Sequence, residues 1–591
     1  MSIKYWENKK NLVTWKRKPK KTYSLRAGKH YWYEDGLINA SYNCLDININ
    51  LGLGDKVAIY YFDKNKNFQS ITYKELLKFV SNCSLFLKDK IKNIKKPKII
   101  IYGSASLETS IAMLSCARMG VHFSVIFQDL SYDAVKIRSK LLNANFLISR
   151  CLEKNFYEKI LKDKIFKKEN IILTSYAKLN VLGINSTNLL ELKYSKFFKP
   201  KFVKGSNDFF TLFTSGSTGH PKGVTHSLAG YLIYNKLTCI KKFGISKNSA
   251  IFTASDAGWI NGHSYALFGP LSLGASTVIL EVPYLILDDQ FLKLILKTCR
   301  ITILYLPVTL IRLMKSIYTK KIKSKYLKVI GSMGEPLAFS VGKWFAKNFE
   351  LSNKAIINTY FQTETGGIIS SASYKNSSLQ VKHGSSGKAL TNHIGLFLDK
   401  SNNTPEFKIK NPWPGCMSSI INSKKIYESY YDENNNFKLF DTGFFDKKNN
   451  IHVTGRIDDV INIRGHRIGS SEFESIILSN NGIKEACAIS IDSKLEGSMF
   501  VVFLVSKNQK KINKDDINRL IILNFGNFAV PKNIFQIKEL PKTRSGKILR
   551  RLLRFIYTNP DQKYKNDLST ILNPNIINEI KKKVFHEKYK G

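Results

Sequence analysis

The stretch Thr214-Ser-Gly-Ser-Thr-Gly-His-Pro-Lys-Gly223 follows an apolar run, Phe209 to Phe213, that predicts the end of a strand. Glycines and small hydroxyl residues dominate it, so its backbone N–H groups and hydroxyls can turn onto phosphate oxygens. Lys222 adds a positive charge where those phosphates would lie. Because Pro221 and Gly223 stand where a Walker A loop needs Gly and Ser or Thr, the stretch predicts a phosphate loop of another type.

Around this loop, apolar runs of strand length alternate with helical patterns. The alternation is visible at 97–102, 107–119, 121–127, 301–306, 307–314, 326–330 and 355–359. It predicts an α/β fold of mostly parallel sheets covered by helices. Ligands in such folds bind at the carboxyl ends of the strands, and the motifs described below fall at those ends. The region 401–450 predicts loops and short strands, and a new unit begins after Arg456.

The size and composition favour a large folded protein of a reducing compartment. The chain has 591 residues, is 43% hydrophobic and carries eight scattered cysteines without a CxxC pair. We therefore expect several domains, no structural metal and a cytoplasmic location. The polar N-terminus lacks a signal-peptide core, and no long uncharged apolar run predicts a membrane span, so no membrane partner is expected.

The net charge of +47 raises the alternative of a basic nucleic-acid-binding protein. The lysines are spread over the whole chain, without an arginine-rich tract, zinc-finger spacing or aromatic-glycine RNA motif. We interpret most of the charge as compositional bias. A smaller part can attract polyanionic substrates such as nucleotides, and weak non-specific nucleic-acid binding at low salt is compatible with it.

Four further stretches carry side chains suited to chemistry. The loop at 255–265 combines an aromatic residue, glycines and polar groups, which suits a small carboxylate pocket. The segments 331–336 and 358–367 follow strands, and Glu364 offers oxygen ligands for Mg²⁺ beside a triphosphate. The fourth pairs the stretch 454–467, which begins Thr-Gly-Arg-Ile-Asp-Asp, with the late basic segment 540–551, in which Lys547 lies in a Ser-Gly loop.

The order of these motifs resembles that of the adenylate-forming superfamily, and most closely that of acetyl- and propionyl-CoA synthetases. The resemblance runs nearly from end to end, since 39–46 and 567–574 look like the N-terminal and C-terminal segments of that group. It implies a large N-terminal domain (1–457) with a β-barrel-like subdomain, and a small mobile α+β lid domain (458–591). Asp458 matches the hinge of the lid.

The resemblance also implies the reaction. ATP and a small carboxylic acid form acyl-AMP and pyrophosphate, and CoA then accepts the acyl group. Lys547, Glu364 and Lys222 are the implied catalytic residues, with Glu364 as the Mg²⁺ ligand, and the chemistry is electrostatic stabilisation and positioning. Nucleotide-binding roles are implied for Thr214, Ser215, Gly216, Ser217, Thr218, Gly219, Gly334, Glu335, Pro336, Asn358, Thr359, Tyr360, Phe361, Gln362, Thr363, Asp441, Arg456 and Arg467.

Asp441 is matched by spacing, because the ribose-binding aspartate of the family lies fifteen residues before the motif arginine, here Arg456. Leu439-Phe440 replace the family's Thr-Gly in front of it.

The implied acyl pocket consists of Trp259, Asn261, Met333 and Phe361, and three of these depart from the family pattern. Phe361 replaces a tryptophan, which leaves room for one or two more methylenes, each worth about 0.8 kcal/mol when buried. Met333 replaces a smaller valine and therefore reduces the room for a longer acyl chain. Asn261 favours a polar acyl chain. We therefore expect a short acid, with propionate at least as good as acetate.

The resemblance implies Arg464 and Gly465 as CoA contacts, but the CoA-binding residues match the family pattern less well than the nucleotide-binding residues do. The acetate enzymes carry an arginine cluster near residue 150, where this chain has Arg150 alone, and a lid arginine falls on Ile522. Arg464, where the family usually has Ser, can compensate through its affinity for phosphate.

Three alternatives stay open: loading of a carrier-protein thiol, a nucleic-acid-binding protein, and an inactive relative. The acid is open as well, and the expected assembly is a monomer or a small homo-oligomer.

Overall fold

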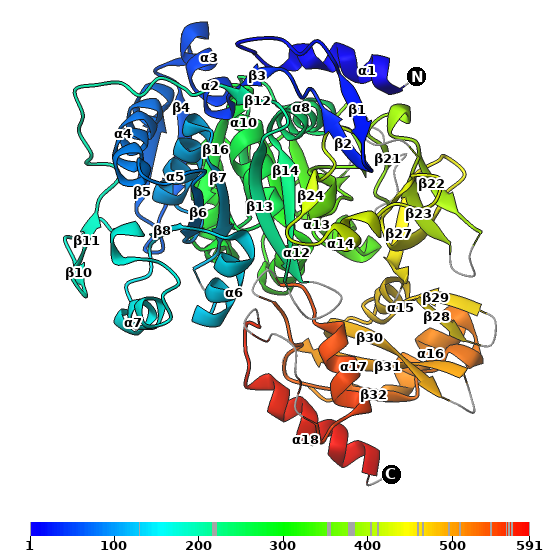
Figure 1. Ribbon diagram of the computed structural model, residues 1–591. Coiled ribbons are helices and arrows are strands. Elements are labelled where there is room, and N and C mark those ends of the chain that lie inside the picture. Colours follow the sequence, from blue (N-terminus) through cyan, green and yellow to red (C-terminus); the bar gives the residue numbers. More distant parts are fainter. Residues whose placement is uncertain are drawn as a thin grey trace.

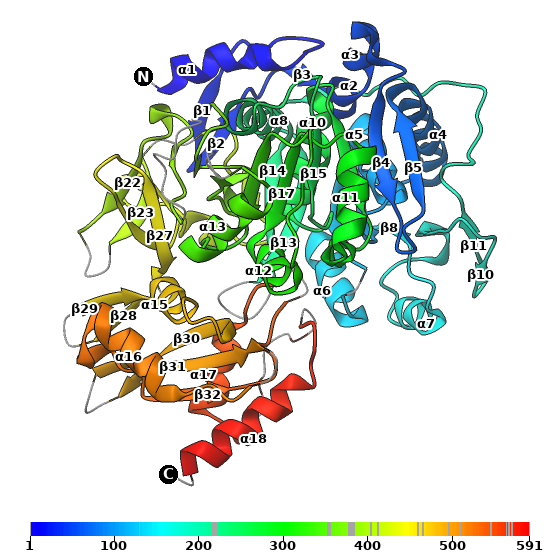
Figure 2. The same ribbon diagram turned by 180° about the vertical axis from the view of Figure 1, so that it is seen from behind.

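The computed structural model describes most of the chain. The described residues are 2–128, 130–215, 221–351, 356–375, 384–401, 405–410, 413–457, 460–463, 466–493, 497–507, 510–543, 546–562, 564, 568 and 571–589. Figures 1 and 2 show a large unit that holds most of the sheets, and a smaller unit beside it that contains the C-terminal part of the chain.

A nine-stranded sheet carries the glycine-rich stretch. Its order is β10 (Asn180–Val181), β11 (Ile184–Thr187), β9 (Ile171–Thr174), β8 (Phe146–Ser149), β6 (Lys98–Tyr102), β7 (His122–Ile126), β13 (Asp208–Ser215), β14 (Pro221–Ser227) and β24 (Ser419–Ile420). The strands from β11 to β13 run parallel, whereas β14 and β24 are antiparallel to their neighbours. The parallel part confirms the predicted fold class.

A second sheet of seven strands carries the later motifs. Its order is β19 (Ile357–Asn358), β18 (Val329–Met333), β17 (Ile303–Pro307), β15 (Ala250–Thr253), β16 (Ser276–Leu280), β4 (Val57–Phe62) and β5 (Phe68–Thr72). All of its pairings are parallel except β4–β5. The carboxyl ends of β15, β17, β18 and β19 therefore meet at one edge, where ligands of α/β proteins bind.

Helices α4 (Tyr73–Ile91), α5 (Leu107–Met119) and α8 (Leu228–Thr238) share one hydrophobic core with strands of both sheets. Every residue of α5 is buried, which fits a helix enclosed between layers. Ser106 caps its first turn, and Gly120 ends it at a φ of 63°, a conformation that glycine adopts without strain. The two sheets are thus held together through shared helices.

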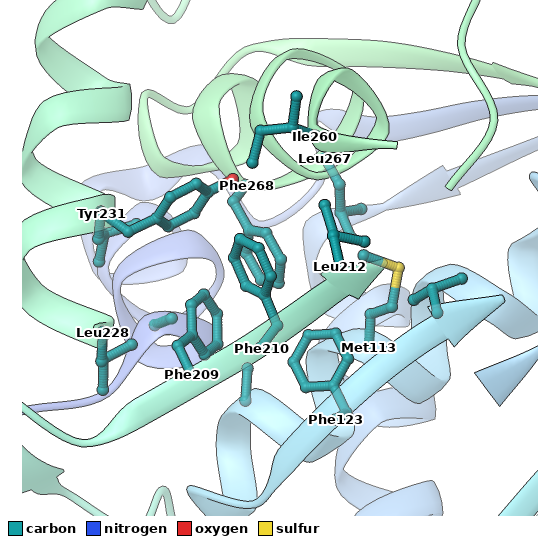
Figure 3. Close-up of a cluster of buried hydrophobic side chains, with 14 of the residues drawn as sticks. Met113, Phe123, Phe209, Phe210, Leu212, Leu228, Tyr231, Ile260, Leu267 and Phe268 are labelled. Carbon is teal, nitrogen blue, oxygen red and sulfur yellow. The ribbon is translucent and has the colours of Figure 1, made fainter. Parts of the chain in front are cut away.

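The core is aromatic around β13. Figure 3 shows side chains of β13 packed against residues of α5, β7, α8 and the segment 260–268. The rings of Phe209 and Phe268 lie 5.0 Å apart, and those of Phe210 and Tyr231 meet edge to face at 4.7 Å. Edge-to-face pairs add to the stability supplied by burial alone. They fix the strand directly before Thr214.

Several predicted elements agree with the structure, and two boundaries are wrong. The helix at 107–119 and the strand ending at Tyr102 are confirmed. The glycine-rich stretch is shorter than a loop of ten residues, because β13 continues to Ser215 and β14 begins at Pro221; cross-strand pairing extends both ends. Likewise, β18 runs from Val329 to Met333, since pairing with β17 and β19 draws the first residues of the 331–336 motif into the sheet.

Small antiparallel sheets follow, where a barrel-like subdomain was expected. They are β20 (Ser370–Ser371) with β21 (Lys388–Ala389), β22 (Leu396–Asp399) with β23 (Glu406–Ile409) and β25 (Phe437–Lys438), and β26 (Asp441–Phe445) with β27 (Ile451–Arg456). Short strands and loops were predicted for 401–450. The described residues of this region form short strands and loops, but also the helix α14 (Lys424–Glu428), which was not predicted.

The C-terminal unit has its own hydrophobic clusters, whose buried members all follow residue 467. It contains the hairpin β28 (Val460–Ile463) and β29 (His466–Gly469), the sheet β30 (Ile483–Ser493), β31 (Gly497–Ser506) and β32 (Asn533–Gln536), and the helices α15 (Ser470–Ile477), α16 (Lys514–Phe525), α17 (Arg550–Thr558) and α18 (Ile576–Tyr589). The predicted hinge Asp458 lies outside the described residues, so the domain boundary and the mobility of the lid stay predictions.

Within the described part of the chain, no helix combines the length and the apolar character needed to cross a membrane. The eight cysteines are buried and form no disulfide.

Candidate functional site

The hairpin of β13 and β14 brings the ends of the glycine-rich stretch together. Thr214 pairs with Lys222, and Ser215 with Pro221. The ammonium of Lys222 lies 2.6 Å from Oε1 of Glu364, which belongs to a short 3₁₀ turn, Thr363–Thr365, after β19. Two implied catalytic residues from the two large sheets therefore form one ion pair. Gly216, Ser217, Thr218 and Gly219 lie outside the described residues.

Tyr430 contacts both members of this pair, and no sequence motif had pointed to it. Its hydroxyl donates to Oε1 of Glu364 at 2.9 Å and accepts a hydrogen bond from Lys222, whose ammonium lies 4.8 Å from the centre of the tyrosine ring. Tyr430 follows α14 (Lys424–Glu428), in the region predicted only as loops and short strands. No motif surrounds it, so only the fold reveals its place.

The electrostatics keep Glu364 charged. Burial alone raises the pKa of this carboxyl, but the adjacent Lys222 ammonium and the hydrogen bonds outweigh burial, and the pKa lies below its ordinary value. Behind it, Nε2 of the buried His226 lies 2.8 Å from the carbonyl oxygen of Thr363. Burial lowers the pKa of His226 to about 4, so the neutral ring donates to that carbonyl at neutral pH.

A second cluster forms around Asp441, at the start of β26 and opposite Arg456 on β27. Its Oδ2 accepts hydrogen bonds from the hydroxyl of Tyr360 and from Nε2 of Gln362, both at 2.6 Å. Its Oδ1 lies 3.3 Å from Nη1 of Arg456. Burial raises the pKa of Asp441 above its ordinary value, although these three partners favour the carboxylate. The spacing argument therefore selects an aspartate that contacts three other implied nucleotide residues.

Most other implied nucleotide residues lie at the carboxyl ends of β18 and β19. Asn358 accepts from the Ser332 hydroxyl at 3.0 Å and donates to the Ser385 carbonyl, also at 3.0 Å. The Thr359 hydroxyl is 2.6 Å from that of Tyr305. These bonds hold both loops at one edge of the sheet.

Next to them, Gly334 has a φ of 90°, and a Cβ there would meet open space, so the backbone conformation itself favours glycine. Glu335 accepts from Nη2 of Arg312 at 2.5 Å, and Pro336 is exposed.

Three of the implied acyl-pocket residues lie together. Met333 is buried in a cluster with Tyr265 and Tyr305, and Phe361 packs against the same cluster. Nδ2 of the buried Asn261 contacts the sulfur of Met333. Oδ1 of Asn261 is also buried, and it accepts no hydrogen bond from the described residues. Trp259 does not belong to this cluster, and its ring stacks on that of Phe127 with 5.5 Å between the ring centres.

The loop of Lys547 belongs to the C-terminal unit but reaches the large one. Lys547 is exposed, and its backbone pairs with Thr543. The neighbouring Gly546 has a φ of 84° and lies against Thr309 at the start of α12 (Val308–Ile317), where a Cβ would be 2.8 Å from the Thr309 hydroxyl. The loop therefore meets the large unit beyond the carboxyl end of β17. Arg464, Gly465 and the side chain of Arg467 are outside the described part of the structure.

Arg150, at the position of the family's arginine cluster, is enclosed by acids. Its Nη1 lies 2.8 Å from Oε1 of Glu281 and donates to the Ser104 hydroxyl at 2.6 Å, while its Nε is 3.6 Å from the buried Glu108. Two carboxylates already neutralise this guanidinium, which argues against a phosphate-binding role for Arg150.

Glu364 offers a carboxylate that suits a metal ion bound together with phosphate groups. No group of three or more potential ligands among His, Cys, Asp and Glu gathers within the described residues. Mg²⁺ commonly uses one or two carboxylates together with substrate phosphate oxygens, and Glu364 can supply one such carboxylate. The donor set at Glu364 is therefore compatible with a nucleotide-bound Mg²⁺.

Comparison with protein families covers most of the chain. The AMP-binding enzyme family matches residues 51–406, its C-terminal domain matches 472–547, and the acetyl-coenzyme A synthetase N-terminus matches 2–44. Among individual proteins, acetyl-coenzyme A synthetase from Herminiimonas arsenicoxydans is 32% identical over 97% of this chain and 92% of its own length. The chloroplastic/glyoxysomal acetyl-coenzyme A synthetase of Arabidopsis thaliana is 31% identical over 93% of this chain and 78% of its own.

Solved structures agree in fold. Acetoacetyl-CoA synthetase from Streptomyces lividans superposes with a TM-score of 0.82 at 16% identity, covering 99% of this chain and 93% of that one. An anthranilate CoA ligase in complex with anthranoyl-AMP gives a TM-score of 0.74 at 18% identity, over 88% of this chain and 97% of its own. At these identities the likeness concerns the fold alone.

Proposed function

Since the chain belongs to the AMP-binding enzyme family and is an AMP-forming acid–thiol ligase, we propose that it activates a short carboxylic acid with ATP and transfers the acyl group to CoA. The observation that carries the proposal is the convergence of Lys222, Glu364 and Tyr430 beside the glycine-rich hairpin. A cation and an anion held together there suit a triphosphate and its metal.

In the first step, a carboxylate oxygen of the acid attacks the α-phosphorus of ATP, and pyrophosphate leaves. Both reactants are anions, so positive charge must offset their repulsion. Lys222 lies where the leaving phosphates would bind, and Lys547 is the residue proposed to neutralise the reacting carboxylate and α-phosphate. A Mg²⁺ held in part by Glu364 would neutralise phosphate oxygens.

The adenosine is proposed to bind near Asp441. The Asp441 carboxylate suits ribose hydroxyls, and Tyr360, Gln362 and Arg456 orient it through the bonds given above. Asn358 and Gly334 would frame the base at the ends of β18 and β19.

In the second step, the CoA sulfur attacks the acyl carbonyl carbon, and AMP leaves with the electron pair of the broken carbon–oxygen bond. We propose that the C-terminal unit rotates about Asp458 between the steps, so that one site serves both. Arg464 and Gly465 are the proposed CoA contacts, because Arg150 is engaged by Glu281 and Glu108.

The acid is proposed to be propionate or a chain of similar length, with acetate also used. Phe361 is smaller than the tryptophan that the family resemblance implies at this position, and it packs against the same cluster as the larger-than-valine Met333. The buried Oδ1 of Asn261 can accept a hydrogen bond, which favours an acid that carries a hydroxyl near its carboxylate. A 3-hydroxy acid is therefore the polar candidate.

A panel of linear acids of two to five carbons and of 3-hydroxy acids tests the proposal. AMP release is measured for each acid with and without CoA. We expect CoA-dependent turnover with a maximum at a short acid. AMP release that requires a carrier-protein thiol instead of CoA would support the alternative acceptor, and the absence of acid-dependent pyrophosphate exchange would indicate an inactive relative.

A further inference from the structure

A basic cavity is lined by residues that neighbour Tyr360 and Asp441 through backbone pairing. Its volume is about 250 Å³, and Lys241, Lys242, Lys388 and Lys448 contribute to its walls together with Ser371 and Asn450. These residues come from the π-helical turn Cys239–Phe243 that follows α8, from β20–β21 and from the turn of the β26–β27 hairpin. None of the motifs described above includes them.

One of these lysines is buried. The exposed fraction of Lys242 is 4%, and its ammonium donates to the carbonyl oxygens of Ser371 at 2.8 Å and Lys388 at 3.0 Å. Burying an ammonium is unfavourable unless an opposite charge compensates it. Burial and the neighbouring Lys241 lower the pKa of Lys242 to about 7. An anion placed beside it would favour the charged form.

The protein supplies little counter-charge at this cavity. Within the described part of the chain, no carboxylate lies within ion-pair distance of any of the four lysines. The nearest acid along the hairpin, Asp446, uses its oxygens to accept the backbone N–H groups of Lys448 and Asn450 at 2.9 Å, and the side-chain amide of Asn450 at 3.0 Å. It stabilises the turn that presents Lys448.

We propose that this cavity binds a small phosphate anion, either inorganic phosphate or pyrophosphate. Lysines on three separate elements can surround such an ion, and lysine binds phosphate as a point charge. Pockets for drug-sized ligands begin at about 300 Å³, so the cavity suits a small anion better than a whole nucleotide. The site is distinct from the one at Lys222, and the proposal does not depend on which acid the enzyme activates.

Backbone pairing connects the cavity to the proposed nucleotide site. The backbone N–H of Tyr360 donates to the carbonyl oxygen of Ser370 at 2.9 Å, and the next residue, Ser371, holds Lys242. On the other wall, the hairpin that ends in the Lys448 turn begins with Asp441. A bound anion would therefore hold together strands that support both Tyr360 and Asp441.

The test compares wild type with the triple variant K241Q/K388Q/K448Q, which removes three exposed charges and leaves Lys242 in place. A matched control, K78Q/K88Q/K92Q, removes three exposed lysines from α4 and its C-terminal end. Inorganic phosphate and pyrophosphate are titrated separately at constant ionic strength. Hydrogen exchange of 369–375, 388–390 and 446–451 reports on the cavity, and that of 221–227 reports on the site at Lys222.

We expect both anions to slow exchange in the cavity segments of wild type and of the control variant. In the triple variant the dissociation constant for that protection should rise roughly tenfold or more, equivalent to about 1.4 kcal/mol. Protection confined to 221–227, or cavity protection that is equal in all three proteins, would overturn the proposal. Protection by pyrophosphate but not by phosphate would identify the diphosphate as the ligand.

Discussion

The ammonium of Lys222 lies 2.6 Å from the carboxylate of Glu364, although 142 positions separate the two residues in the chain. Lys222 lies on β14 of the nine-stranded sheet, and Glu364 follows β19 of the seven-stranded sheet. The contact therefore joins the two sheets at their ligand-binding edges. Its strength should be measurable separately from catalysis.

Lys222→Met should destabilise the protein by roughly 3–5 kcal/mol, because it leaves Glu364 buried without its opposite charge. Glu364→Gln should have a smaller effect, and adding it to Lys222→Met should restore part of the loss. The free energy of unfolding in urea for the two single variants and the double variant gives the coupling between them. Additive effects would mean that the pair contributes no interaction of its own.

The pH dependence of stability should change sign when Lys222 is replaced. In wild type the folded pKa of Glu364 is below its ordinary value, so its stabilisation is present above the unfolded pKa and is lost as pH falls through the folded pKa. In Lys222→Met the strongest opposition to burial is removed, so burial should outweigh the remaining hydrogen bonds, including that from Tyr430, and raise the pKa of Glu364. The difference in unfolding free energy between wild type and Lys222→Met should therefore shrink as pH falls from neutral to about 4. A constant difference over that range would contradict this assignment.

Tyr430→Phe should weaken the use of ATP by roughly tenfold to a hundredfold in kcat/KM, because hydrogen bonds to charged groups contribute about 1.5–3 kcal/mol. The ring remains below Lys222, so the fold should be kept. Tyr427→Phe is the matched control, since its hydroxyl contacts Tyr431 instead of the ion pair. Equal effects of the two substitutions on kcat/KM for ATP would remove Tyr430 from the site.

Phe361→Trp should shift the acid preference towards acetate. The larger ring fills space beside Met333, so each methylene that no longer fits loses about 0.8 kcal/mol, a factor of about four. The ratio of kcat/KM for propionate to that for acetate measures the shift. If wild type already prefers acetate a hundredfold, the enlarged pocket is refuted.

Lys547→Ala should abolish carboxylate-dependent pyrophosphate exchange while sparing thioester formation from added acyl-adenylate, because its charge is needed only while two anions approach each other. Lys532→Ala, another exposed lysine of the C-terminal unit, should change neither reaction. Loss of both half-reactions in Lys547→Ala would assign the residue a structural or binding role instead.

Much of the fold was predictable because helix and strand periodicity is local. The helix at 107–119 begins at a Ser cap and ends at a glycine, and both signals are visible in the sequence. The ends of β13, β14 and β18 were not predictable, because pairing with strands distant in sequence extends them. A propensity argument assigns Pro221-Lys-Gly223 to a loop, and only the register with Phe213 to Ser215 shows a strand.

Site residues that belong to a sequence motif could be predicted, whereas residues that reach the site only through tertiary contacts could not. Glu364 and Lys222 stand in recognisable patterns, but Tyr430 lies among Tyr, Asp and Asn residues that resemble any surface loop. The same limit applies to Arg150, because the sequence does not reveal that two carboxylates enclose its guanidinium. The two carboxylates that neutralise Arg150 belong to Glu108 and Glu281, and both residues are distant from it in the sequence.

The direct pairing of Asp441 with Arg456 makes the length of one hairpin a constraint on evolution. The number of residues between Asp441 and Arg456 has to stay the same, because a shift of one residue in the strand register would turn one of the two side chains to the opposite face of the hairpin. The residues that precede Asp441 take no part in this pairing, so Leu439 and Phe440 can stand there in place of the Thr-Gly that the family resemblance implies. Homologues of this chain should therefore be recognised more reliably by that interval than by the residues that precede the aspartate.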